Sequence, residues 1–230
     1  MKKILSVVVF LFAAFSCSPV LGQEQFPSWV PPEAVQAAKE RWLHMMGLKT
    51  DARLFEQYGI WPEDLPRSQL KDPRKIIGID YESYQPDSSD IFTMLNDRNG
   101  KYANAFGFSV FIDEKCVGTI VVSLRDQQWV QREITGANKD VEDVYARIYS
   151  SYPPSDDLII YETMDAAFFV VMDDKVIDTF HWNVETMAFE EMNPAQYMMK
   201  EKARILEFKK SAYYQHILEI KKQQHADSLR

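Results

Sequence analysis

Two stretches of the sequence, sixty positions apart, carry the same pattern of apolar runs around an acidic-Lys turn. They are residues 108–122 and 168–182, and aligned without a gap they share Phe, Val, Asp, Lys and Thr at five of fifteen positions. Two apolar runs on either side of a short polar turn are typical of a β-hairpin. The sequence therefore predicts two similar hairpins, and the rest of the chain can be organised around them.

Each hairpin belongs to a longer series of predicted elements. A strand precedes it, a third strand follows it, and a helix capped by asparagine closes the series. This order predicts an α+β protein with an antiparallel sheet of about six to seven strands, helices packed against it and a long C-terminal helix. The elements are strands 75–81, 127–135, 158–163 and 186–190, with caps at Asn138 and Asn193.

The origin of this repetition has two interpretations. One is an internal duplication, with units at residues 105–150 and 158–220. The other is a pair of independent hairpins in one continuous sheet, because hairpins of similar chemistry converge on the same residues. Both interpretations predict the same strands.

The N-terminus has the features of a secretory signal. Two lysines precede an apolar run from Ile4 to Phe15, which is shorter than the roughly 20 residues that span a bilayer. We therefore expect residues 1–22 to direct export to the periplasm, the cell surface or the medium. Two processing routes stay open: cleavage after Gly22, or lipidation of Cys17, because residues 14–17 resemble a bacterial lipobox. No later run is long and uncharged enough to cross a membrane.

The mature chain is predicted to form a single domain. Residues 23–32 form an extended tether, residues 33–220 form the domain and residues 221–230 form a polar tail. Within the domain, apolar residues at helical spacing predict a helix that starts near Glu33, and three prolines predict an irregular connection over residues 60–74. A heptad-like stripe on the last helix keeps self-association open.

Composition limits the partners of the mature chain. Removal of residues 1–22 leaves 24 Lys and Arg against 34 Asp and Glu. Such an acidic balance disfavours nucleic acid, which is bound through clustered basic side chains. No sequence motif with cofactor-binding, metal-binding or nucleophile spacing occurs, so we predict neither a cofactor nor a metal site.

Candidate site residues come from the differences between the hairpins. Cys116 and Val121 in the first hairpin correspond to Val176 and His181 in the second. We therefore place a candidate site near His181, Trp182, Asp178 and Cys116. Cys116 is the one cysteine outside the signal segment, so no disulfide forms within the mature chain.

Three functions stay open on the sequence alone. The missing motifs and the export signal favour a non-catalytic binding module at the cell envelope, with a protein or a glycan as its partner. The first alternative is a hydrolase with dispersed residues, for example a Cys116–His181 thiol–imidazole pair. The second is an inhibitor or propeptide-like protein whose exposed hairpin binds a target enzyme by edge pairing.

Overall fold

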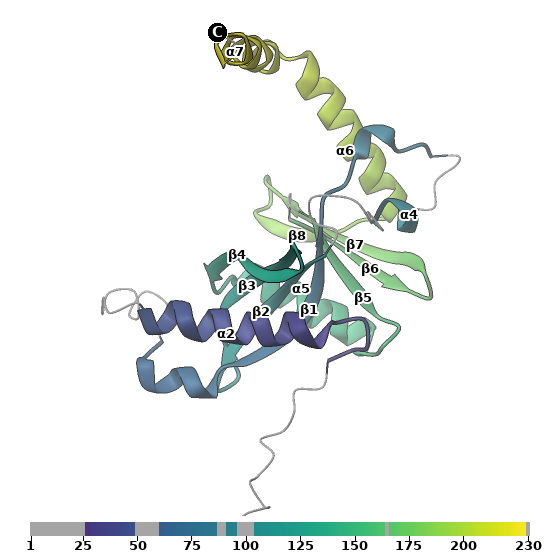
Figure 1. Ribbon diagram of the computed structural model, residues 1–230. Coiled ribbons are helices and arrows are strands. Elements are labelled where there is room, and N and C mark those ends of the chain that lie inside the picture. The colour runs from purple at the N-terminus through teal and green to yellow at the C-terminus, as the bar shows by residue number, and fades with distance from the viewer. Residues whose placement is uncertain (1–25, 49–59, 87–90, 96–103, 164–165, 229–230) are drawn as a thin grey trace, which may run out of the picture.

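The computed structural model describes residues 26–48, 60–86, 91–95, 104–163 and 166–228 (Figure 1). The predicted signal segment and the candidate lipidation site Cys17 lie outside these residues. Within them, no helix is both long enough and apolar enough to traverse a lipid bilayer.

The core of the protein is one eight-stranded sheet with the order β4-β3-β2-β1-β5-β6-β7-β8. The β1–β5 pair is parallel and the other neighbouring strands are antiparallel. The predicted α+β class is confirmed, with slightly more strands than expected. The strands are β1 (Gln69–Ile77), β2 (Ala105–Ile112), β3 (Lys115–Arg125), β4 (Gln128–Gly136), β5 (Ile159–Thr163), β6 (Ala167–Met172), β7 (Lys175–Asn183) and β8 (Ala188–Glu191).

The sheet consists of two four-stranded units, unit 1 (β1–β4) and unit 2 (β5–β8), joined along the parallel β1–β5 pair. The hairpin turns match, because residues 113–114 and 173–174 all have φ between 48° and 65°. Two successive positive φ values are typical of a type I′ turn. The register also shifts at equivalent places, after Val110 in one hairpin and after Val170 in the other. The two predicted hairpins therefore share the type of turn, the position of the bulge and the arrangement of the neighbouring strands.

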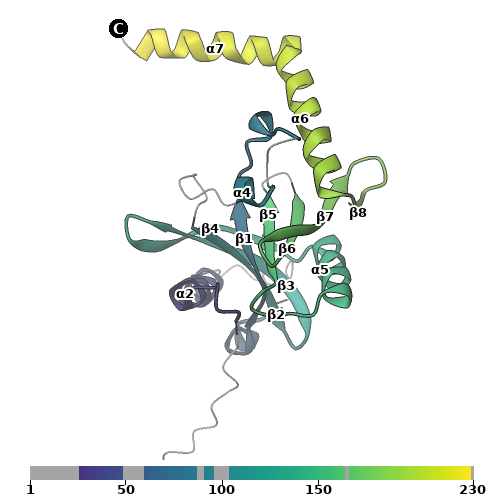
Figure 2. The ribbon, with the colours of Figure 1, turned by 90° about the vertical axis from the view of Figure 1, so that its right-hand side faces the viewer.

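Each unit packs its equivalent face against the helix that precedes it in the chain. Phe108 and Val110 pack in the cluster under α2 (Pro32–Leu48), and their counterparts Phe168 and Val170 pack under α5 (Lys139–Ser151). The two helices lie on opposite sides of the sheet (Figure 2). The structural repeat is thus a helix followed by four strands, whereas the sequence pattern grouped each helix with the strands before it.

The second face of unit 2 is covered by α6 (Pro194–Lys210), together with α4 (Ile91–Leu95) and a 3₁₀ turn at Tyr81–Ser83. Both predicted asparagine caps are present: Asn138 accepts from the amide of Asp140, and Asn193 accepts from the amide of Ala195, each at 3.0 Å. These caps fix where α5 and α6 begin.

The predicted long C-terminal helix is two helices. The backbone turns at Ser211, whose ψ is 146°, and α7 (Ala212–Ser228) then projects away from the sheet (Figure 2). The predicted heptad stripe is therefore interrupted at Ser211. Helical structure continues to Ser228, through most of the segment that was predicted to be a polar tail.

Strand β1 begins earlier than predicted. The prolines placed residues 60–74 in an irregular connection, yet β1 includes Pro73. The pairing with β2 shifts between Lys71 and Arg74, and Asp72 has a φ of 50°. A bulge of this kind accommodates a proline without the loss of a ladder hydrogen bond. Because β1 starts earlier, Arg74 lies in the centre of the sheet and not in the predicted connection.

Candidate functional site

A cavity of about 420 Å³ lies over unit 1, on the face opposite α2. Its floor includes Thr119 and Val121 of β3, which alternate along the strand with residues that pack under α2. Strands β1, β4 and β5 and the start of α5 complete its walls. The lining consists of Arg74, Ile76, Thr119, Val121, Arg132, Glu133, Thr135, Asn138, Val141, Glu162, Thr163 and Ala166.

The equivalent place in unit 2 is filled by α6. Thr119 and Val121 correspond in the gapless alignment to Thr179 and His181, both of which are buried. The ring of Tyr197 lies 5.6 Å from the ring of His181 and 5.5 Å from that of Phe169. Unit 1 therefore has a cavity where unit 2 has an aromatic side chain carried by a helix.

Arg74 lies at the base of the cavity and is only 2% exposed. Its Nε donates to the carboxylate of Glu162, and its Nη2 lies 3.4 Å from the hydroxyl of Thr119. The side chain extends over Gly107, where an added Cβ would lie 3.0 Å from Nε. The absence of a side chain at Gly107 thus makes room for the arginine.

The charge of Arg74 is fixed by its surroundings. Burial alone lowers the pKa of Arg74, but Glu162, Tyr145 and Asp72 together outweigh this effect and raise that pKa above its ordinary value. Burial also raises the pKa of Tyr145, whose ring lies 5.7 Å from the Arg74 guanidinium. The cavity base is therefore an ion pair beside a neutral phenol, a stable arrangement for recognising a polar group.

Asp72 extends this polar network toward the other end of β1. Burial raises the pKa of its carboxyl, while the charge of Arg74 and hydrogen bonds from Ser109 and Tyr149 oppose that shift. Burial raises the pKa of Tyr149 well above its ordinary value, so its hydroxyl stays protonated and donates to Asp72. These contacts tie α5 to β1 at the boundary between the two units.

Two further hollows lie near the tether. One, of about 290 Å³, is mainly apolar, and the amide of Ser28 fastens its edge to Asp156 with a hydrogen bond of 2.6 Å. The other, of about 890 Å³, borders the first hairpin turn, and Arg67 at its rim pairs with Asp64 and Asp113. Neither hollow has a buried ion pair at its base, so the cavity over unit 1 is the better candidate.

The structure does not bring Cys116 and His181 together. Cys116 lies on β3 and His181 on β7, with four strands between them. Five steps of about 4.8 Å separate the two strands by about 24 Å. His181 is 5% exposed, and its Nδ1 lies 3.1 Å from the carbonyl oxygen of Glu190. The thiol–imidazole pair that would make a hydrolase is therefore not formed.

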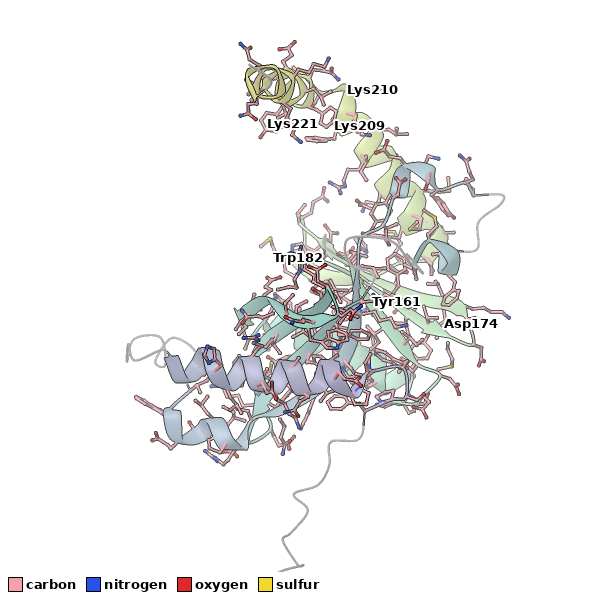
Figure 3. All side chains as sticks on the ribbon, in the orientation of Figure 1. Tyr161, Asp174, Trp182, Lys209, Lys210 and Lys221 are labelled. Atoms are coloured by element: carbon pink, nitrogen blue, oxygen red, sulfur yellow. The ribbon has the colours of Figure 1, made fainter. Side chains whose placement is uncertain are left out.

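The two remaining candidate residues lie on the other face of β7. Asp178 is buried beside the hydroxyl of Tyr152, and Trp182 packs edge-on against Phe189 at 5.2 Å (Figure 3 labels Trp182). Both belong to the packing under α5, whereas His181 faces α6. The four predicted residues thus form no common site.

Neither of the two predicted hairpins lies at an edge of the sheet, so edge pairing with a target, the predicted inhibitor mode, would have to use β4 or β8. Each strand of both hairpins has hydrogen-bonded neighbours on both sides, since the free edges of the sheet belong to β4 and β8. A target strand cannot pair with a hairpin that is already flanked by strands.

Cys116 has the surroundings of an inert thiol. Burial raises its pKa to about 11, and its Sγ lies 3.6 Å from the carbonyl oxygen of Gly118. We predict that a thiol-specific disulfide reagent will not label native protein at neutral pH, because the thiolate is the reactive form. The reagent should label one thiol per mature chain once urea unfolds the protein. Stoichiometric labelling of the native chain would contradict this assignment.

Sequence reasoning missed Arg74 and Glu162. Both are charged residues within apolar strands, and a charge in such a place is rarely buried unless it is paired. That signal was present in the predicted strand 158–163, which contains Glu162. Its partner was hidden because Arg74 follows Pro73 and was assigned to a loop.

Within the described ranges, no group of three or more His, Cys, Asp or Glu side chains is arranged to hold a metal ion. Comparisons of the chain with protein-family models, with curated proteins and with solved structures found no match. The function is therefore argued from the geometry of the cavity.

Proposed function

We propose that this protein is an exported, non-catalytic binding module of the cell envelope, and that the cavity over unit 1 receives its ligand. The observation that carries this proposal is the contrast between the units. In unit 2, Tyr197 fills the place above Thr179 and His181, whereas in unit 1 the corresponding place is empty of protein side chains from the described residues. The export signal supports the location at the envelope.

The lining favours a ligand of limited size with both polar and apolar groups. About 420 Å³ accommodates one large side chain or one sugar ring, near the lower end of the range for ligand sites. Thr119, Thr135 and Asn138 offer hydroxyl and amide groups, while Val121 and Val141 offer apolar contact. A tyrosine side chain and a sugar both match this mixture, in keeping with a protein or a glycan as partner.

Binding is favoured over catalysis because the charged groups at the base of the cavity are already paired. Arg74 and Glu162 neutralise each other, and the pair is held by Thr119. A general acid or base needs a pKa near the working pH, and the raised pKa of Arg74 removes it from that role. The same pair is well suited to orient a polar group without chemistry.

The proposal is tested by saturation-transfer NMR on the mature chain, residues 23–230, with a panel of monosaccharides and N-acetylated amino-acid amides. We expect at least one sugar or N-acetyl-tyrosinamide to bind, and we expect Val121→Trp to abolish that binding because the new ring fills the cavity. The matched control is Val184→Trp at a position that is 73% exposed on unit 2, which should bind normally. Binding that survives Val121→Trp, or conversion of a bound probe into new products, would sink the proposal.

A further inference from the structure

Helix α7 presents an apolar stripe away from the sheet. Tyr213, Ile217 and Ile220 recur at i, i+4 and i+7, the spacing of one helix face. Tyr213 is 66% exposed and Ile220 is 44% exposed. Near the bend, the rings of Tyr213 and Tyr214 contact Phe208 of α6, at centroid distances of 6.4 and 5.4 Å. The helix is held at its start and carries its stripe outward.

The residues of α7 repeat the spacing by which α6 covers unit 2. In α6 the buried positions after Pro194 are Tyr197, Met198 and Glu201. Sixteen positions later, Tyr213, Tyr214 and Ile217 have the same i, i+1, i+4 arrangement and a tyrosine at the first place. The chain therefore contains one helix fitted to a sheet face and a second helix of similar pattern that lacks one.

The C-terminal segment and the rest of the mature chain have net charges of opposite sign. Residues 193–230 carry eight Lys and Arg against four Asp and Glu, whereas residues 23–192 carry 16 against 30. In the arm formed by α7, Lys221 lies far from the sheet (Figure 3), and Lys221 and Lys222 are accompanied by Glu219 and Asp227. Lys209, at the end of α6, pairs with Glu82. The cavity lining includes both Arg132 and Glu133. The adjoining start of α5 adds Lys139 together with Asp140, Glu142 and Asp143, so acidic side chains outnumber basic ones on this side of the cavity.

The crowding of these carboxylates is visible in Glu142. Burial and the neighbouring charges of Asp143 and Asp72 raise the pKa of Glu142. Lys221 and Lys222 of α7, placed beside these carboxylates, would relieve the repulsion, because opposite charges attract across an interface and orient the partners.

We propose that α7 of a second copy lies over unit 1 and inserts Tyr213 into the cavity, as Tyr197 of α6 packs on unit 2. This inference rests on the proposed function and names the partner of the same site. With 17 residues, α7 is about 26 Å long, enough to cross four strands spaced about 4.8 Å apart. Two copies exchange their arms reciprocally, so the dimer closes with twofold symmetry and each cavity receives one tyrosine.

The dimer is tested first by sedimentation equilibrium of the mature chain. We expect a reversible dimer whose dissociation constant rises at least about tenfold in Tyr213→Ala, since an exposed aromatic anchor in a pocket dominates such an interface. Gln215→Ala, an exposed position on the side of α7 opposite Tyr213, is the matched control and should leave the constant unchanged. A monomer at every concentration, or equal effects of the two substitutions, overturns the inference.

Disulfide trapping then locates the arm. Thr135→Cys places a thiol on the cavity wall at an exposed position, and Tyr213→Cys places one on the arm. A mixture of the two single variants should form a mixed disulfide dimer under mild oxidation, whereas Val184→Cys mixed with Tyr213→Cys should not. Preferential crosslinking of Tyr213→Cys to itself would show pairing of arm with arm and overturn the inference.

The two proposals fail in different ways. If the arm occupies the cavity, N-acetyl-tyrosinamide should bind Tyr213→Ala more strongly than the self-associating parent chain. If the parent chain is monomeric and binds a probe that Val121→Trp excludes, the inference fails while the proposed function stands. If neither the parent chain nor Tyr213→Ala binds any probe, and no dimer forms, both fail.

Discussion

Replacement of Glu162 by glutamine should lower the free energy of unfolding by about 3–5 kcal/mol, because it leaves the charge of Arg74 buried without a counter-charge. Glu162 itself retains 22% side-chain exposure, but its partner Arg74 retains only 2%. The penalty is therefore set by the guanidinium, which is almost fully buried. Urea denaturation of the mature chain, followed by circular dichroism, measures the change.

The matched control is Glu114→Gln, which removes the same charge from an exposed pair. Glu114 lies 3.0 Å from the ammonium of Lys71 and is 85% exposed, so its loss should change stability by less than about 0.5 kcal/mol. The double change Arg74→Met and Glu162→Leu should recover much of the loss, since apolar residues of similar size replace buried ion pairs well. Equal effects of Glu162→Gln and Glu114→Gln would show that the buried pair is not a stabilising element.

The second large effect is expected for Trp42→Ala. Trp42 is 1% exposed in the cluster under α2, and its ring lies where a Cβ on Gly118 would approach to 3.1 Å. Its Nε1 also donates to the hydroxyl of Ser68 at 3.2 Å. Truncation leaves a large void between α2 and β3, so we expect a loss of about 3–5 kcal/mol.

Thermal and urea unfolding of Trp42→Ala measure this loss. Trp61→Ala at a position that is 50% exposed is the matched control and should have a much smaller effect. Trp42→Phe should fall between the two, because it keeps much of the apolar volume but not the hydrogen bond. A Trp42→Ala variant as stable as Trp61→Ala would mean that α2 is not anchored through this side chain.

The hairpins were predictable because the information for them is local. Apolar runs on either side of an acidic-Lys turn define each one, and the structure places both turns where the pattern puts them. The predicted start of strand β1 lay too far along the chain, because local rules treat Pro73 as a residue that interrupts a strand. The bulge that accommodates it, with Asp72 at a φ of 50°, depends on the pairing with β2 and is not encoded in neighbouring residues.

The cavity was not predictable for a related reason. Arg74 and Glu162 are 88 positions apart, and they meet because β1 pairs in parallel with β5. Parallel partners are joined by long connections, so no spacing in the sequence reports them. The prediction of a candidate site near His181 did rest on a real difference between the units. Its physical cause is that α6 covers His181, whereas its counterpart Val121 lines a cavity.

The parallel β1–β5 pair has a consequence for the order of folding. Unit 1 is complete, with its own helix, before β5 is synthesised, so the outer side of β1 must wait as an open edge. On that side β5 later pairs with Lys75–Ile77, and directly before this segment β1 carries Lys71, Pro73 and the bulge that interrupts its pairing with β2. Proline, lysine and bulges are the features by which proteins prevent wrong strands from pairing with an edge. The residues that made β1 hard to recognise thus protect the newly made half-sheet from aggregation until its second half arrives.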